Sequence, residues 1–374
     1  MIAKSWAEEV LACAVSTGAD FAGLYGEHTR NQSVFMVDGK IDRVTDNLLS
    51  GVGIRAFLGT RTVFASTSDL SREGLLRCAA SVAAAVGEGK REQAVRLNER
   101  IFPNIHPATV VPSGVEASER ASLLREGCFA AKEYDESISQ VSGSLSSVDH
   151  TILIANTEGL YTTDRHIRTR MAVQAVASRD GENQSGSDSP GAGCGLELFD
   201  RVSPADIGKE AARQATVNLR ASYCPAGVMT VAIENGFGGV IFHEACGHSL
   251  EATSVAIGAS QMAGKLGQQI ANPKVTAIDD GTVPGAWGSV NIDDEGTPTQ
   301  RNVLIENGIL KSYLIDRLGS RRMGMPMTGS ARRQNYQYEA TSRMTNTFIA
   351  NGPDRNEDII ASIENGLYCR KMGG

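Results

Sequence analysis

The chain has 374 residues, of which 41% are hydrophobic and 21% charged, a composition typical of a folded protein of two or three domains rather than a disordered chain. The formal net charge is −7, from 36 Lys and Arg against 43 Asp and Glu, so the overall basic character of many nucleic-acid-binding proteins is absent. No apolar run of 18 residues occurs, so no membrane partner is expected, and the acidic net charge predicts no nucleic-acid partner. The seven cysteines form no C-x-x-C pair, which predicts free thiols in a cytoplasmic protein.

The first part of the chain alternates helical patterns with strand pairs. We expect helices over 5–16 and 71–87, where apolar residues recur at helical spacing. Between them, Asp38-Gly39 and Gly59-Thr60 are two-residue turns typical of β-hairpins. The predicted strands are 21–25, 33–37, 40–44, 51–58 and 61–66. Helices beside antiparallel hairpins indicate an α+β fold.

The middle of the chain repeats this pattern after a proline-dotted connection over 88–113. Helical patterns cover 115–133 and 204–219. The predicted strands between them are 141–147, 151–155 and 167–177. The Gly- and Ser-rich segment 181–195 has no clear period, so we expect a long loop or flap there, which would gate access to a site.

A second, β-rich domain is expected to follow residue 220. The sequence therefore predicts an N-terminal α+β domain over 1–220 and a C-terminal domain over 221–374. In the second domain the predicted elements are a strand at 228–233, a glycine turn at 234–239, a helix at 240–250, strands at 274–279 and within 302–315, and a helix at 355–365 capped by Asp354.

One cluster in the second domain has the residue types for metal chemistry. His243, Glu244 and His248 form an H-E-x-x-x-H motif: two imidazoles can bind zinc, and a carboxylate beside them can accept a proton from water. In a straight α-helix, five residues rotate the chain by about 500°, which leaves the two rings about 140° out of line. We therefore expect a local distortion, such as a π-type turn, at Gly247. The alternative is two ordinary polar histidines at the start of a helix.

Two other charged stretches allow more than one interpretation. Residues 293–296 (Asp-Asp-Glu-Gly) could bind a cation, although their spacing favours a structural turn. The arginine-rich stretch 317–333 could bind a peptide carboxylate, and the alternative is a solvated loop or a partner contact. The remaining histidines, His150 and His166 among them, are expected to be ordinary polar residues.

Several segments resemble the TldD/PmbA (TldD/TldE) metalloprotease family, on its TldD side. These are residues 18–76, 238–253 with the H-E-x-x-x-H motif, 279–317 and 343–352, in family order. The resemblance implies a zinc peptidase that hydrolyses unfolded or small peptides, with His243 and His248 as zinc ligands and Glu244 as the catalytic base. It also implies either a TldE/PmbA-like partner subunit or a homo-oligomer. We expect the peptide to bind as an added strand.

The sequence departs from the family pattern at its end. The family's third zinc ligand is a cysteine beyond a glycine-rich segment, which would begin near residues 371–374. We therefore expect an incomplete C-terminal domain, with Cys369, Cys246 and Glu251 as weak candidates for a substitute ligand. The alternative function is a catalytically inactive regulatory or interaction subunit of a TldD/TldE-type complex.

Overall fold

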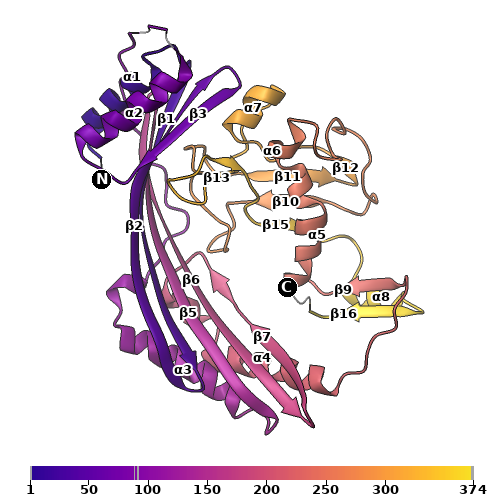
Figure 1. The fold of residues 1–374 in the computed structure, drawn as a ribbon. Coiled ribbons are helices and arrows are strands. Elements are labelled where there is room, and N and C mark those ends of the chain that lie inside the picture. The colour runs from indigo at the N-terminus through magenta and orange to yellow at the C-terminus, as the bar shows by residue number, and fades with distance from the viewer. Residues whose placement is uncertain (1, 88, 91, 372–374) are drawn as a thin grey trace.

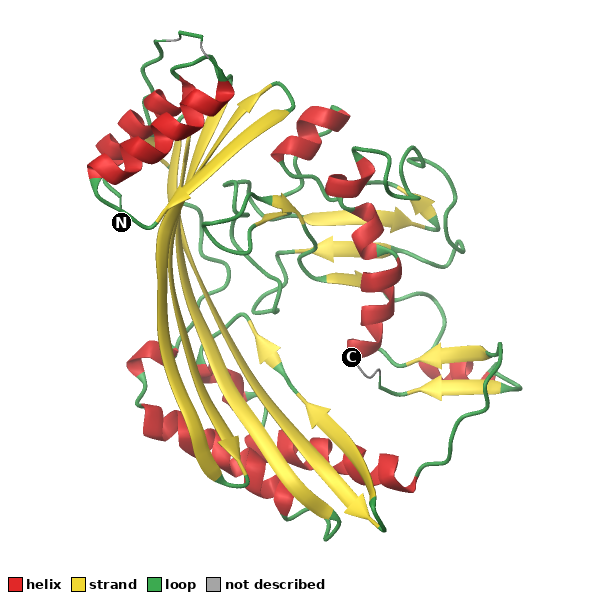
Figure 2. Cartoon of the chain, in the orientation of Figure 1, coloured by secondary structure: helices red, strands yellow, loops and turns green. Residues whose placement is uncertain are grey.

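The computed structural model describes residues 2–87, 89–90 and 92–371. It confirms the α+β prediction: a long curved antiparallel sheet has helices on its outer face, and the C-terminal half of the chain lies on the concave side (Figure 1). Figure 2 shows that the helices of the N-terminal half gather at the two ends of this sheet. No helix in the described ranges is long and apolar enough to cross a membrane.

Four strands of 17 to 20 residues make up most of the sheet. They lie in the order β2-β1-β5-β6 and all pair antiparallel. Their bounds are β1 Phe21–Val37, β2 Lys40–Leu58, β5 Ile138–Asn156 and β6 Leu160–Arg179. The prediction of separate short strands was wrong. Polar segments such as 26–32 continue the strand because their backbone pairs with a neighbour on each side.

Shorter strands extend the sheet at its edges. β3 (Arg61–Thr67) pairs with β2 across the predicted Gly59-Thr60 turn, and β4 (Asn98–Glu99) pairs parallel to β6. The other predicted turn, Asp38-Gly39, is also confirmed, with φ of 45° and 76° at its two residues.

The segment 181–195 is mostly strand, so the expected loop or flap was wrong. β7 (Glu182–Asp188) and β8 (Gly191–Ala192) both pair with β6, and η2 (Leu196–Asp200) follows. A Cβ atom at Gly186 would overlap the backbone oxygen of Ala211. The small residues of this segment therefore allow a helix to pack directly on the strand, and they do not mark mobility.

Two pairs of helices cover the outer face of the sheet. α1 (Lys4–Val15) and α2 (Arg72–Val86) pack at one end, and α3 (Ala117–Lys132) and α4 (Pro204–Arg220) at the other. The short η1 (Pro112–Gly114) precedes α3. Each pair buries its own apolar cluster against the sheet, and both clusters use even-numbered residues of β1: Ala22 and Leu24 at one end, Val34 and Met36 at the other.

The C-terminal half contains a second sheet, in the order β12-β11-β10-β15. Its strands are β10 Ala277–Asp280, β11 Arg301–Glu306, β12 Ile309–Leu310 and β15 Thr347–Ile349. Two small sheets accompany it, one of β13 (Ala331–Arg332) with β14 (Thr341–Ser342) and one of β9 (Thr230–Ile233) with β16 (Gly366–Cys369). The short helices are η3 Gly236–Gly239, α5 Val240–Ala245, η4 Gly247–Leu250, α6 Ala252–Val255, α7 Arg317–Met323 and α8 Asn356–Ala361.

The predicted helix over 355–365 is only partly present. α8 ends at Ala361, and Gly366 begins β16, which pairs in parallel with β9. Asp354 does not cap the helix, because its carboxylate accepts a hydrogen bond from Lys274 Nζ at 2.7 Å and Arg355 occupies the cap position. Pairing with a strand more than 130 residues away therefore overrides the local helical pattern.

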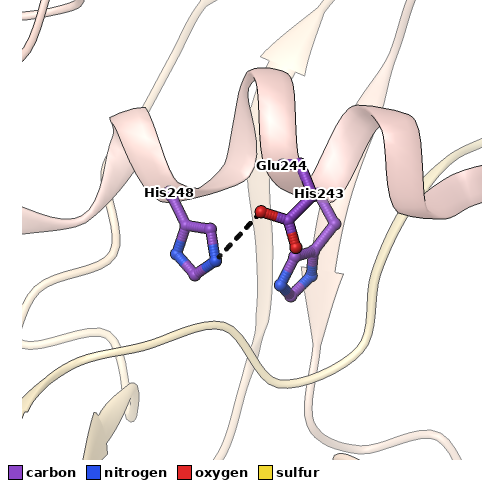
Figure 3. A group of neighbouring side chains, drawn as sticks. All are labelled: His243, Glu244 and His248. Atoms are coloured by element: carbon purple, nitrogen blue, oxygen red, sulfur yellow. Dashed lines mark ion pairs between the residues drawn. The ribbon is translucent and has the colours of Figure 1, made fainter. Parts of the chain in front are cut away.

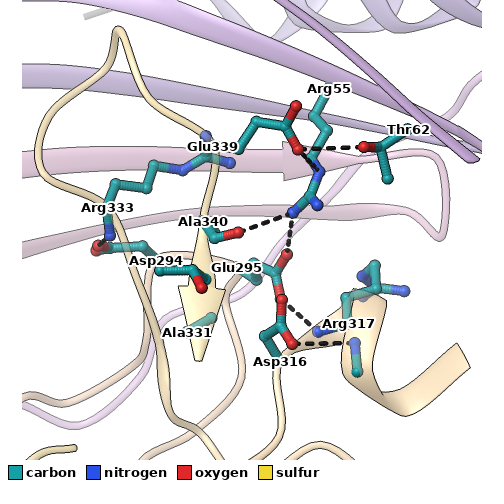
Figure 4. Close-up of polar contacts among 12 residues, drawn as sticks. Arg55, Thr62, Asp294, Glu295, Asp316, Arg317, Ala331, Arg333, Glu339 and Ala340 are labelled. Atoms are coloured by element: carbon teal, nitrogen blue, oxygen red, sulfur yellow. Dashed lines mark hydrogen bonds and ion pairs between the residues drawn. The ribbon is translucent and has the colours of Figure 1, made fainter. Parts of the chain in front are cut away.

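Ion pairs of the buried residues Arg55 and Arg317 join the C-terminal half to the long sheet (Figure 4). Arg55 of β2 lies 3.4 Å from Glu295 and 2.9 Å from Glu339, and donates to the backbone oxygen of Ala340 at 3.1 Å. Arg317 completes the cluster: its backbone N–H donates to Glu295, and its side chain pairs with Glu158.

The acidic stretch 293–296 and the arginine-rich stretch 317–333 belong to the same contact. Asp293 accepts backbone N–H bonds from Glu295, Thr297 and Ala331, as the structural-turn interpretation expects. Arg321 pairs with Asp20, and half-buried Arg333 packs over Tyr25 at 4.8 Å. These two arginines contact the chain's own N-terminal half. For them, both the solvated-loop prediction and the peptide-binding prediction were therefore wrong.

Candidate metal centre

The H-E-x-x-x-H motif spans an interrupted helix. α5 ends at Ala245, Cys246 leaves helical geometry with φ of −128°, and the chain continues as the 3₁₀ turn η4. The expected distortion exists, but it is a break at Cys246 and not a π-type turn at Gly247. Gly247 lies close to Met344, because a Cβ atom there would overlap the sulfur of that side chain.

The break brings both histidines to one side. The rings of His243 and His248 lie with their centroids 4.8 Å apart, nearly perpendicular at 85°. Glu244 Oε2 lies 4.0 Å from His248 Nε2 (Figure 3). One ligand atom from each of the three residues fits within a mutual distance of 4.8 Å.

The substitute ligands considered from sequence do not join this group. Among the residues that the structure describes, it contains no cysteine: Cys246 packs against the apolar cluster of this half, and Cys369 lies in β16. Glu251 touches the group from outside, with Oε1 3.1 Å from Nδ1 of His248. Its other oxygen lies 3.6 Å from Arg343.

Burial sets the protonation of the site. It lowers the pKa of His243, and the neighbouring His248 lowers that pKa further. This favours neutral imidazole, the form with a lone pair for a metal. Burial also raises the pKa of Glu251, against the opposing effects of Arg343 and His248. Two imidazoles beside a carboxylate match the nitrogen and oxygen donors that zinc takes in proteins.

A cavity of about 640 Å³ opens beside the motif. His243 and Glu244 line it together with the edge strand β15, whose one partner strand among the described residues is β10. Most of the remaining wall is apolar; it includes Phe237, Ile241, Phe348, Ile349, Ile359 and Ile360.

The other histidines considered from sequence belong to the long sheet. His150 and His166 stack with centroids 5.9 Å apart. His150 contacts Tyr25 and Thr29 by hydrogen bonds, and His166 contacts Asp164. Both have partners within the chain, as expected of ordinary polar residues.

Several curated proteins are similar to this chain over almost its whole length. A metalloprotease TldD homolog of Haemophilus influenzae is 36% identical over 365 residues, covering 95% of this chain and 75% of the relative. A metalloprotease of Methanothermobacter thermautotrophicus is 30% identical, with 95% and 77% covered.

Solved structures share the fold at lower identity. A Thermotoga maritima protein described as a candidate modulator of DNA gyrase matches with a TM-score of 0.81 at 23% identity, covering 99% of this chain and 82% of that one. TldE from Thermococcus kodakarensis matches with a TM-score of 0.72 at 20% identity and the same coverage.

Three family models account for most of the sequence. Residues 22–86 match PmbA/TldA metallopeptidase domain 1, residues 111–219 the central domain and residues 226–374 the C-terminal domain. The last match contains the H-E-x-x-x-H motif, as the sequence resemblance predicts. The chain therefore belongs to the PmbA/TldD family of metallopeptidases.

Proposed function

We propose that this protein is a zinc-dependent peptidase that hydrolyses peptide bonds in unfolded or small peptide substrates. The observation that carries the proposal is the close grouping of His243, Glu244 and His248 at the helix break. Family membership supports the peptidase class. In this proposal His243 and His248 hold the metal and Glu244 is the general base.

In the proposed hydrolysis, the bound metal, Glu244 and His243 have different roles. When bound, zinc would supply a Lewis acid for water and for the scissile carbonyl. The Glu244 side chain is 67% exposed, so its carboxylate is open to an incoming substrate. It would accept the proton of the attacking water and pass it to the leaving amine. The lowered pKa of His243 keeps that ring neutral and able to bind.

The substrate we propose is an extended peptide that pairs with β15. Within the part of the chain that the structure describes, this strand has one edge that pairs with no other strand; it contacts α5 and lines the same cavity as His243 and Glu244. Main-chain hydrogen bonds to an edge strand tolerate many side chains, which suits unfolded substrates. The apolar wall of the cavity would accept side chains of the same peptide.

We further propose a cytoplasmic setting and a partner, either a TldE/PmbA-like subunit or a second copy of the chain. The likeness of this fold to that of TldE supports such pairing of related subunits. A pull-down or light-scattering measurement on the purified protein would separate the two arrangements by mass.

A second candidate function follows from the donor count. Catalytic zinc sites usually have three protein ligands, and within the described ranges the group offers two imidazoles and the proposed base. A non-catalytic subunit that keeps the fold is therefore the alternative. Absence of both bound zinc and peptidase activity in the wild-type protein would favour it.

The test combines metal content with activity. We expect Glu244→Gln to retain zinc and lose roughly 10²–10⁴-fold in cleavage of an unstructured fluorogenic peptide, because the proton acceptor is gone. The double variant His243→Ala/His248→Ala should lose zinc, measured by elemental analysis. Glu306→Gln, an exposed carboxylate on β11, is the matched control. Full activity of Glu244→Gln with zinc bound would refute the role of Glu244.

A further inference from the structure

The two ring nitrogens of His248 face different carboxylates. Nε2 lies 4.0 Å from Glu244, on the side of the grouped ligand atoms. Nδ1 lies 3.1 Å from Glu251 Oε1. While Glu251 is ionised it can only accept hydrogen bonds, and this contact then places the proton of a neutral His248 ring on Nδ1. The lone pair of Nε2 then remains free for a metal.

The Glu251 side chain is more deeply buried than those of Glu244 and His248. Its side chain is 8% exposed, whereas that of Glu244 is 67% exposed. Its two chain neighbours are fully buried and bonded to one core residue: Ala252 N–H donates to the oxygen of Leu314 at 2.8 Å, and Leu314 N–H donates to the oxygen of Leu250 at 2.9 Å. The backbone is therefore fixed on both sides of Glu251.

A third contact fixes the carboxylate. Glu251 Oε2 lies 3.6 Å from Arg343, on a different segment of the chain from the motif. One oxygen thus faces His248 and the other faces a cation. Because one oxygen contacts His248 and the other faces Arg343, Glu251 is placed to orient His248, a proposed metal ligand, and not to bind the metal itself.

We propose that Glu251 is the positioning residue of this metal centre, which fixes the orientation and the tautomer of His248. The inference rests on the proposed function, since it concerns the same metal. A helix interrupted at Cys246 does not by itself constrain the ring that follows the break. A buried carboxylate on the far nitrogen supplies that constraint, and loss of such a group typically lowers metal affinity 10–100-fold.

The first experiment needs no metal. Long-range ¹H–¹⁵N spectra of the metal-free protein, with the His248 signals assigned from a His248→Asn variant, report which ring nitrogen carries the proton. We expect the Nδ1–H tautomer in the wild-type protein and in Glu251→Gln, whose amide oxygen can still accept. Glu251→Ala should give a mixture. A wild-type ring protonated on Nε2 alone would overturn the inference, whatever the variants do.

The second experiment measures affinity for Zn²⁺ by competition with a chromophoric chelator. We expect Glu251→Ala to bind Zn²⁺ roughly 10–100-fold more weakly, Glu251→Gln to show a smaller loss, and Glu306→Ala to match the wild type. The absorption of the Co²⁺-loaded protein should keep its wild-type shape in Glu251→Gln. A changed Co²⁺ spectrum there would make Glu251 a ligand and overturn the positioning role, as would unchanged Zn²⁺ affinity in Glu251→Ala.

The two proposals can fail separately. If the wild-type protein binds no Zn²⁺, or if His243→Ala/His248→Ala still binds it at the same affinity, the proposed function fails. If the wild type binds Zn²⁺ through the histidines but neither the His248 tautomer nor the Zn²⁺ affinity changes when Glu251 is replaced, only the positioning role fails. Should Glu251→Ala not fold, the wild-type tautomer and Glu251→Gln still decide the question.

Discussion

Replacing Arg55 with methionine should loosen the attachment of the C-terminal half to the long sheet. The Arg55 side chain is 3% exposed and lies against Glu295, which is equally enclosed, and against Glu339. Methionine keeps much of the apolar stem, but among the described residues it leaves Glu295 with the backbone N–H of Arg317 as its one remaining close donor. Removing one partner of a buried ion pair lowers the free energy of unfolding by roughly 3–5 kcal/mol. Because the Arg317 N–H still donates to Glu295, we expect the lower end of this range, about 3 kcal/mol.

Urea unfolding tests this value. The transition can be followed by circular dichroism and by the fluorescence of Trp6 and Trp287, one in each half of the chain. Arg30→Met is the control: Arg30 pairs with Asp46, but its side chain is 44% exposed and the pair is screened by water, so we expect a much smaller loss than for Arg55→Met. The double variant Arg55→Met/Glu295→Gln removes both charges and should recover part of the loss. Equal costs for Arg55→Met and Arg30→Met, or no recovery in the double variant, would refute the reasoning.

Two further predictions concern packing and pH. Gly208→Ala should destabilise the protein by roughly 1–3 kcal/mol in the same assay, because a Cβ atom on α4 would overlap the backbone oxygen of Gly127 on α3. Gly114→Ala, which meets no neighbouring atom, should be neutral or slightly stabilising, and equal effects of the two changes would contradict the close helix contact. Burial lowers the pKa of His150 to about 4 from its usual 6.5, so unfolding takes up a proton between these values. The stability that His150 contributes is therefore complete above pH 6.5 and is lost as the pH falls through 4. Relative to His150→Gln, the wild type should lose about 2 kcal/mol between pH 7 and pH 5, and a gap that does not change with pH would exclude the shifted pKa.

The sequence was sufficient for elements that are decided locally. α1, α2, α3 and α4 begin and end within two residues of the helical patterns, because an amphipathic period over 12 to 17 residues leaves few alternatives. Both two-residue turns were also predicted, since their sequences favour the required backbone conformation.

Elements decided by distant partners were missed. The polar middle of β1 gives no strand signal of its own and is a strand because β2 and β5 flank it. The segment of β7 was expected to be a loop because its small residues are typical of loops, whereas they are required for contact with α4. The end of α8 is set by the pairing of β16 with β9.

The candidate metal centre also combines a part that the sequence predicted with a part that it did not. The motif identified His243, Glu244 and His248 as one group, and the geometry of a helix indicated that a distortion must lie between the histidines. Its position at Cys246 could not be predicted from the spacing of the motif. Glu251 was visible three residues after His248, but which side of the ring it contacts depends on Leu314 and Arg343, both distant in sequence.

The two apolar clusters on the outer face of the long sheet have a consequence for how its strands find their partners. Both clusters draw on even-numbered residues of β1, from Ala22 to Met36, a span of roughly 40–50 Å along the strand. Displacing β1 by one residue against β2 would turn the side chains at both ends towards the wrong face together. A mispaired strand would therefore lose the packing of α1 and α2 and also that of α3 and α4. Once β1 and β2 have the correct register at one end, the side chains at the other end already face the helices that pack there. No separate contact in the middle of the strands is then needed to set the register.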